Sequence, residues 1–308
     1  MIVFLNPRAG AGSALARWER IAPRMRERFG EITVFPLNSP DTIVAGLAEY
    51  ARSDDPRIVA AGGDGTANAV IHALLSGPPD LAQRCILGAL GLGSSNDFHK
   101  PFNKAGSIDG IPARLAFDRA TWCDAGRATF SADGWTSVRY FFLNASIGIT
   151  AEGNCRFNTP GPVLGVLKRL STPAAISFAA ITALLRYKET QVTIAVPDSH
   201  TITLPLTNLG ILKSPHFSGE LHYDVVRDYA NGKFAIVSCE RMGIGQRVQL
   251  FRALLRGPTE GLTGVRSWST ASCSITAERP VPMEFDGETV IASAAQFTVV
   301  PHALRVCP

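Results

Sequence analysis

The segment RIVAAGGDGTANAVIHALLS, residues 57–76, decides how the chain is expected to fold. Residues 58–61 form a short apolar run bounded by turn residues, which is typical of a buried parallel strand. The three glycines of residues 62–65 are free to take positive φ, and Thr66 stands where the N-cap of a following helix is expected. A strand, a glycine loop and a helix start together direct backbone N–H groups towards a phosphate.

Asp64 lies inside this glycine loop, where its carboxylate would repel a bare phosphate group. It is better suited to holding Mg²⁺, directly or through water, beside a nucleotide. On these residues alone, a tight strand-to-helix turn in which Asp64 is a local cap remains the alternative, because short motifs also occur by chance.

Two further glycine-rich junctions occur within the first hundred residues. NPRAGAGSA (6–14) follows an apolar strand at residues 2–5, and GLGSSNDF (91–98) follows another at residues 86–90. Leu15 stands where a dinucleotide-binding fingerprint needs its third glycine, which argues against a Rossmann dinucleotide site. Three such junctions indicate a parallel sheet that binds a ligand at the carboxyl ends of its strands.

The third junction also offers polar groups suited to a nucleotide and its metal. Ser94 can donate a hydrogen bond to phosphate, while Asn96 and Asp97 carry oxygens of the kind that Mg²⁺ prefers.

Length and composition limit the class of protein. A chain of 308 residues is long enough for two domains, and its net charge of +4 does not by itself indicate a nucleic-acid binder. Six scattered cysteines without a Cys-x-x-Cys pair argue against a disulfide framework and against a zinc site. The opening strand, MIVFLN, is too short for a signal peptide, so we expect a cytoplasmic protein.

The composition changes near Trp122-Cys123-Asp124, after which β-rich segments dominate. The expected strands cover residues 126–131, 137–149, 190–196, 201–212, 233–239, 265–277, 281–286, 288–292 and 295–300. Their alternating pattern predicts an antiparallel sandwich or barrel. Two helical stretches, at residues 163–187 and 243–257, interrupt it.

Seven motifs along the chain form a recognisable set. They are Asn6-Pro7 with Gly10 and Gly12, Gly62 to Thr66 with Asn68, Gly93 to Phe98, Asp124-Ala125-Gly126, Asn144 to Gly148, Ser214 to Leu221, and Asp286-Gly287-Glu288. These motifs resemble those of the diacylglycerol kinase catalytic-domain family, which includes bacterial lipid kinases and sphingosine kinases. They occur in the order that the family has.

The resemblance implies an α/β fold with a parallel sheet in an N-terminal ATP-binding domain, followed by an antiparallel β-sandwich domain that binds a lipid. The first domain would comprise residues 1–124 plus about 292–308, and the second residues 125–291. It places the active site in the cleft between them. It further implies transfer of the γ-phosphoryl group of ATP, with Mg²⁺, to a hydroxyl of diacylglycerol or a related lipid alcohol.

By motif match, the resemblance also assigns roles to residues. The implied Mg²⁺ network is Asp64, Asn96, Asp97 and Asp124; the implied nucleotide contacts are Asn6, Ser39, Gly62, Gly63, Asp64, Gly65, Thr66, Asn68 and Ser94; the implied catalytic base is Asp286 with Glu288 beside it. Phosphoryl transfer needs positioning, charge neutralisation and one carboxylate near the attacking oxygen, which agrees with these roles. Asp286-Gly287 is also a strong hairpin-turn signal, and a rigid hairpin can present the carboxylate.

The chain departs from the family pattern at several positions. Ser94 replaces the usual threonine and Gly91 the usual proline. Many bacterial relatives hold a structural metal with an Asp-Asp-Gly stretch, where this chain has Ala230-Asn231-Gly232, so Asn231 keeps an oxygen and loses a charge. The family's glycine-rich run near the acceptor site is reduced to Gly219-Glu220, which makes acceptor identity the least transferable property.

The expected partners are a lipid substrate and a membrane surface that the protein touches peripherally, and no nucleic acid. The basic amphipathic stretch 243–257 and the apolar stretch 163–187 are the candidates for lipid contact, although both could simply be core. A homodimer remains open. The alternatives are a kinase of a soluble polyol or nucleotide, and a nucleotide-binding regulator that transfers no phosphate.

Overall fold

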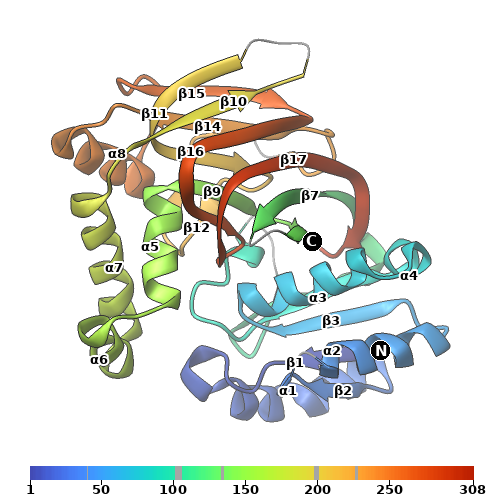
Figure 1. The fold of residues 1–308 in the computed structure, drawn as a ribbon. Coiled ribbons are helices and arrows are strands. Elements are labelled where there is room, and N and C mark those ends of the chain that lie inside the picture. The colour runs from blue at the N-terminus through green and yellow to red at the C-terminus, as the bar shows by residue number, and fades with distance from the viewer. Residues whose placement is uncertain (40, 101–105, 133–134, 198–200, 226–227) are drawn as a thin grey trace.

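The computed structural model describes residues 1–39, 41–100, 106–132, 135–197, 201–225 and 228–308 (Figure 1). Its first part mixes strands and helices, which alternate from the first strand to the third helix. These elements are β1 (Ile2–Leu5), α1 (Ala14–Phe29), β2 (Thr33–Pro36), α2 (Asp41–Arg52), β3 (Arg57–Gly62), α3 (Asp64–Ser76), α4 (Pro79–Arg84), β4 (Ile86–Gly91), β5 (Gly106–Ile108) and β6 (Ile111–Arg114). Position 40, immediately before α2, lies outside the described residues.

Strands β1 to β4 form a parallel sheet covered on both faces by helices. Strand β1 pairs in parallel with β2 and β3, and β3 pairs in parallel with β4. Successive side chains of a strand point to opposite faces, so Phe4 packs in the cluster that includes Val70 of α3, while Val3 packs in the cluster that includes Trp18 of α1. The near-continuous apolar strands follow from this two-sided burial.

The second part is mostly antiparallel strand with four helices among the described residues. Its elements are β7 (Thr121–Ala132), β8 (Trp135–Phe141), β9 (Asn144–Gly148), α5 (Ile149–Asn158), α6 (Pro162–Leu170), α7 (Thr172–Arg186), β10 (Thr190–Ala195), β11 (Thr201–Leu212), β12 (His216–Phe217), β13 (Leu221–His222), β14 (Phe234–Glu240), α8 (Ile244–Arg256), β15 (Val265–Thr270), β16 (Ser272–Phe285) and β17 (Glu288–Val306).

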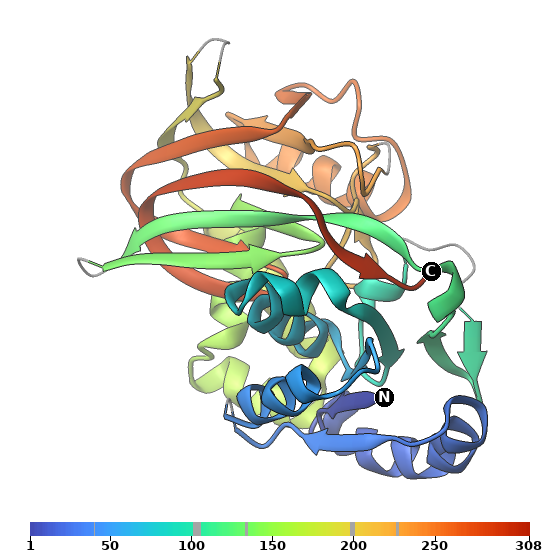
Figure 2. The same ribbon diagram turned by 90° about the vertical axis from the view of Figure 1, so that its right-hand side faces the viewer.

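The antiparallel strands share one apolar core. Figure 2 shows how β7 and β8 (green) and β17 (red) curve. Phe141 of β8 stacks on Phe234 of β14 with ring centroids 5.7 Å apart, although β8 and β14 are not neighbours in the sheet. The end of β17 then joins the two parts, because Arg305 pairs in parallel register with Ile86 of β4. The expectation of a mixed α/β fold with a large antiparallel region is confirmed.

Several element boundaries differ from those expected. The segment 137–149 is two strands, β8 and β9, separated at Phe142-Leu143, and helix α5 begins directly after β9. The helical stretch 163–187 is two helices, because Ser171 ends α6 and its hydroxyl accepts a hydrogen bond from the Ala174 amide at the start of α7. The division into domains at residues 124 and 292 stays a prediction.

The six cysteines are all free thiols, as their spacing predicts. Among the described residues, no helix combines the length and the apolar character needed to cross a membrane.

Candidate active site

The three glycine-rich loops contact one another at the carboxyl ends of β1, β3 and β4. The Leu92 amide donates to the Gly62 carbonyl at 2.8 Å. A Cβ at Gly10 would lie 2.5 Å from the Leu92 carbonyl oxygen, and one at Gly93 would lie 2.4 Å from the Gly63 Cα. Glycine is therefore needed because the loops approach each other closely.

The expected reason for the glycines at 62–65 was wrong. None of these three glycines has positive φ, whereas Gly10 and Gly12 of the first loop do. At Gly62, a Cβ would lie 2.2 Å from the Thr66 hydroxyl, so close packing against α3 requires glycine there.

Helix α3 begins three residues earlier than expected. Gly63 is its N-cap and Asp64 its first residue, so Thr66 lies within the first turn. The Thr66 hydroxyl accepts a hydrogen bond from the Asn6 side-chain amide at 3.2 Å, which ties the first loop to the second. The first N–H groups of a helix have no intrahelical partner, so the start of α3 is suited to an anion.

Asp64 and Asp97 are two carboxylates at this edge of the sheet. Asp64 Oδ1 accepts from the Phe98 amide at 2.8 Å. Asp97 is buried; its Oδ1 accepts from Lys100 Nζ at 2.8 Å and its Oδ2 from the Gly219 amide at 3.0 Å. Burial, followed by the negative charge of Asp97, raises the pKa of Asp64 to about 6.

Of three other predicted residues, Asn96 and Ser94 lie on the loop after β4, and Ser39 lies between β2 and α2. Asn96 has φ of 50° and holds its own loop, since its Oδ1 accepts from the Gly93 amide at 3.1 Å. Ser94 is exposed on that loop. Ser39 is also exposed, and its hydroxyl lies 3.5 Å from that of Thr42 at the start of α2.

Asp286 lies at the tip of the β16–β17 hairpin, as the Asp-Gly signal predicts. Phe285 pairs with Glu288, and the two turn residues have φ of 47° and 93°. Positive φ at both central residues is the type I′ turn that suits a two-residue hairpin.

The Asp286 carboxylate joins the hairpin to the first part of the chain. Its Oδ1 accepts from the amides of Leu143 and Asn144 at 2.9 Å. Its Oδ2 accepts from the Phe142 amide at 2.7 Å and from Asn68 Nδ2 of α3 at 2.8 Å. A carboxylate has about four acceptor positions, so these four donors fill them.

The other half of the predicted catalytic pair is placed differently. Glu288 is exposed at the start of β17, beyond the turn. Asp286 and Glu288 thus lie on one hairpin, with one carboxylate buried and held and the other open to solvent. Asn68 donates to Asp286, and its contact with a nucleotide stays a prediction.

Glu284 is a further buried carboxylate that the sequence reasoning missed. It accepts from the Ser146 hydroxyl at 2.6 Å and from the Gly287 amide at 2.5 Å. Burial, with the nearby charges of Asp286 and Asp97, raises its pKa to about 7. The available signal was a glutamate inside the apolar run VPMEF (281–285), two residues before Asp286.

Asp124 is engaged elsewhere. Its Oδ2 accepts from Lys213 Nζ at 2.9 Å and from the Gly232 amide at 2.8 Å, and its Oδ1 accepts from the His302 amide at 3.0 Å. These contacts pair Asp124 with a lysine, apart from the loops that bring Asp64, Asn96 and Asp97 together.

The donor set fits a magnesium ion at Asp64. Within the described ranges, no three carboxylate, histidine or cysteine side chains already form a metal cluster. Burial and, after it, repulsion by the neighbouring carboxylates raise the pKa of Asp64, and a cation would relieve this repulsion. Mg²⁺ commonly uses one or two carboxylates and completes its shell with phosphate and water.

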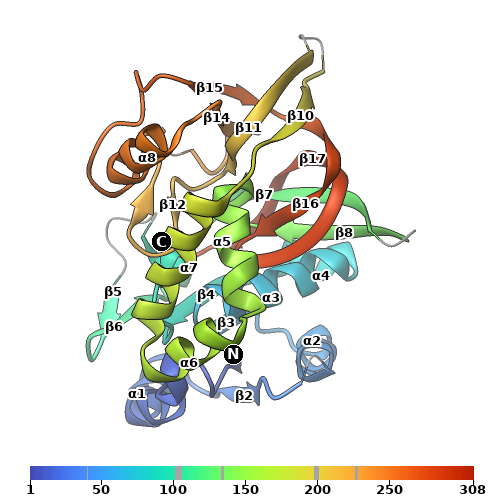
Figure 3. The ribbon, with the colours of Figure 1, turned by 60° about the vertical axis from the view of Figure 1, so that its left-hand side comes forward.

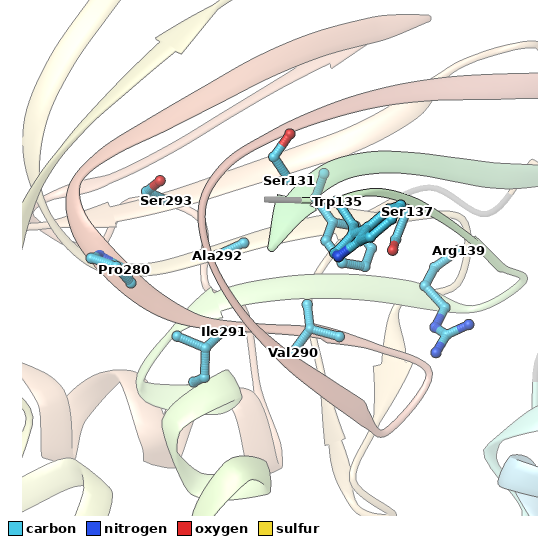
Figure 4. A pocket seen from close by; sticks show the side chains of 10 residues that line it. Ser131, Trp135, Ser137, Arg139, Pro280, Val290, Ile291, Ala292 and Ser293 are labelled. Carbon is cyan, nitrogen blue, oxygen red and sulfur yellow. The ribbon is translucent and has the colours of Figure 1, made fainter. Parts of the chain in front are cut away.

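A surface hollow of about 780 Å³ lies on the antiparallel sheet (Figure 4). Its lining comes from β7, β8, β16 and β17 and consists of Phe130, Ser131, Trp135, Ser137, Arg139, Pro280, Val290, Ile291, Ala292 and Ser293. None of the predicted site residues is among them, so this hollow is separate from the loops described above.

Comparisons with known proteins agree with the resemblance. Residues 1–128 match the family model described as diacylglycerol kinase catalytic domain. No curated protein matches the chain.

The chain also matches solved structures over nearly its whole length. A structure described as a diacylglycerol kinase from Bacillus anthracis is 15% identical, with a TM-score of 0.69, and the match covers 99% of this chain and 95% of that one. A putative diacylglycerol kinase from the same organism is 18% identical, with a TM-score of 0.74 and coverage of 99% and 94%. At these identities the likeness shows the fold.

Proposed function

We propose that the chain is an ATP- and Mg²⁺-dependent lipid kinase that transfers the γ-phosphoryl group to a lipid hydroxyl, with diacylglycerol or a related lipid alcohol as acceptor. One observation carries the proposal: three glycine loops and the Asp64 and Asp97 carboxylates meet beside a hairpin that carries Asp286 and Glu288. The 2.8 Å hydrogen bond from Asn68 to Asp286 links the two sets of groups.

The loops account for phosphate binding and charge neutralisation. The start of α3 offers backbone N–H groups and the positive end of a helix dipole to the phosphates. Asp64 would hold Mg²⁺, which neutralises charge on the transferring group. Asp97, fixed by Lys100 and the Gly219 amide, adds negative charge beside Asp64.

The hairpin is the proposed acceptor side. Four hydrogen bonds hold Asp286 in place, so we propose that Asp286 positions the hairpin. We propose that Glu288, the exposed carboxylate, takes the proton of the acceptor hydroxyl. The acceptor would enter between the parallel and antiparallel parts of the chain. Those parts are the proposed two domains, divided near residue 124, with the end of the chain returning to the first.

A face of α6 and α7 supports contact with a lipid surface. Figure 3 shows these helices beside α5. Several of their large apolar side chains are exposed, including Val163 at 62% and Leu170 at 78%. The sequence has no acidic residue from 153 to 188 and five basic ones, namely Arg156, Lys168, Arg169, Arg186 and Lys188. Exposed apolar groups with a positive charge excess suit an anionic membrane surface.

Helix α8 contributes less to such a face than its three arginines suggest. Arg247 is buried, and its guanidinium donates to the carbonyls of Met242, Leu184 and Tyr187. It therefore caps the end of α7 and holds α8 against it.

Vesicle binding tests this face with two matched substitutions. Val163→Asp should weaken co-sedimentation with phosphatidylglycerol vesicles several-fold, whereas Val44→Asp on α2, where the valine is 68% exposed, should not. Equal binding by both variants would remove α6 from the proposed surface.

The acceptor is tested with labelled ATP and a panel of alcohols. We expect Mg²⁺-dependent label in a lipid of a mixed-micelle panel of diacylglycerol, monoacylglycerol, sphingosine, ceramide and phosphatidylglycerol. Label only in soluble polyols or nucleotides would favour a soluble-substrate kinase. ATP binding without transfer to any acceptor would favour a nucleotide-binding regulator.

A further inference from the structure

Lys213 is a fully buried lysine whose ammonium is surrounded by oxygen atoms. It follows directly after β11, and the side chains of both Lys213 and Asp124 are 0% exposed. Its Nζ lies 2.9 Å from Asp124 Oδ2, 3.2 Å from Asn231 Oδ1, 3.2 Å from the Asp228 carbonyl oxygen and 2.9 Å from the Lys233 carbonyl oxygen. These are one carboxylate, one side-chain amide and two main-chain carbonyls.

This set of oxygens is the kind that a protein normally presents to a hard divalent cation. Calcium sites combine carboxylates with backbone and asparagine carbonyls, and magnesium prefers oxygen donors as well. An ammonium has three N–H donors, so all of them can be used by the four oxygens. The nitrogen occupies the centre of the set, which leaves no place for a metal ion among the same atoms.

The charge balance of the site also favours lysine. Among the residues that the structure describes, Asp124 is the one carboxylate that contacts the ammonium, and Asn231 supplies an uncharged oxygen. The side chain of the exposed Asp228 turns to its own loop, where it accepts from the Ala230 amide. A divalent ion here would leave one positive charge uncompensated in a buried place, which is costly, whereas a lysine is balanced.

The same atoms hold three distant segments together. Asp124 of β7 accepts from the amides of Gly232 and His302, and its own amide donates to the Tyr229 carbonyl at 2.6 Å. The Lys213 amide donates to the carbonyl of Leu143 at 2.9 Å. The ammonium therefore sits where the 228–233 segment, β7 and the end of β17 meet.

We infer that the Lys213 ammonium is a built-in cation that takes the place of a structural metal ion, so that this part of the fold is metal-independent. The residues present do not fit the structural metal that the family resemblance implies near Ala230-Asn231-Gly232. The inference concerns the fold and holds whether or not the chain transfers phosphate.

Thermal melting without nucleotide tests the inference in the wild-type protein first. We expect the same Tm in EDTA, in Mg²⁺ and in Ca²⁺. A Tm that falls in EDTA and recovers with either ion would overturn the inference, because the segment would then depend on a metal.

Substitutions then test whether the lysine acts as the cation. Lys213→Ala should lower the Tm in EDTA by about 5–10 °C, since it leaves a buried carboxylate without its partner. In Lys213→Ala/Asn231→Asp, which has two carboxylates and an open centre, Ca²⁺ or Mg²⁺ should restore much of this loss. Lys233→Ala is the matched control, because it removes the same charge from an exposed side chain. Lys233 contacts the ammonium through its main-chain carbonyl, which the substitution keeps, so its Tm should stay at the wild-type value.

Each variant has an outcome that contradicts the inference. A wild-type Tm for Lys213→Ala would show that the ammonium is dispensable. A double variant whose Tm neither Ca²⁺ nor Mg²⁺ raises would show that the oxygens do not form a cation site. If Lys213→Ala does not fold in EDTA, the single and double variants are both purified in Ca²⁺. Failure to recover the folded double variant in Ca²⁺ would then contradict the inference.

Discussion

Replacing Asp286 by asparagine separates a structural role from a chemical one. The carboxylate accepts four N–H groups, from Asn68 and from the backbone of residues 142–144. The asparagine has one acceptor oxygen, so two of the four buried donors lose their acceptor, at about 1–3 kcal/mol each. Burial raises the pKa of Asp286, and the neutral amide removes that desolvation cost. The net loss of stability is therefore about 3 kcal/mol.

This loss corresponds to a fall in Tm of about 5 °C for 308 residues, because the unfolding entropy is about 2.1 cal/mol/K per residue. Melting curves at neutral pH without nucleotide measure it. Glu288→Gln is the matched control: it neutralises the exposed carboxylate of the same hairpin and should leave Tm unchanged while lowering the rate of transfer. A wild-type Tm for Asp286→Asn, with activity lost, would refute the structural reasoning and return the base role to Asp286.

Three further substitutions test the site. Asp64→Asn should reduce transfer by at least ~10³-fold, as measured by initial rates, because the variant lacks the carboxylate proposed to hold Mg²⁺; a rate near that of the wild type would remove Asp64 from the site. Glu284→Gln should raise Tm by about 5 °C at pH 8 and not at pH 4, since the folded-state pKa of about 7 lies above the ordinary value of 4.5 and the cost of the buried charge is absent below both; equal Tm changes at the two pH values would contradict this. Gly93→Ala should raise the KM for ATP severalfold, because its Cβ would lie 2.4 Å from the Gly63 Cα and push the two loops apart. Gly65→Ala is the control: its Cβ would have no atom within 4 Å, so it should not destabilise the loops.

The loops that form the candidate site were predictable because their signals are local. An apolar run followed by glycines and a helix pattern identifies a strand-to-helix junction, and three of them place their loops at one edge of a parallel sheet. The Asp286-Gly287 turn was predictable for the same reason, since a two-residue hairpin needs positive φ at both positions.

The partners of the buried polar groups were not predictable, because they come from distant segments. Asp286 meets Asn68 across 218 positions of sequence, and Asp124 meets Lys213 across 89. Motif matching placed Asp124 in the Mg²⁺ network, whereas the structure pairs it with the ammonium of Lys213. The break between β8 and β9 was missed because Phe142 and Leu143 continue the apolar pattern, although their amides bind Asp286.

The central claim is that the Asp64 loops and a divalent cation transfer phosphate to a lipid. The most direct measurement is the initial rate of label transfer from ATP to diacylglycerol in mixed micelles, for the wild type in Mg²⁺, the wild type in EDTA, and Asp64→Asn in Mg²⁺. We expect labelled lipid only in the first reaction. Equal transfer in all three, or none in the first with any lipid alcohol as acceptor, would contradict the account.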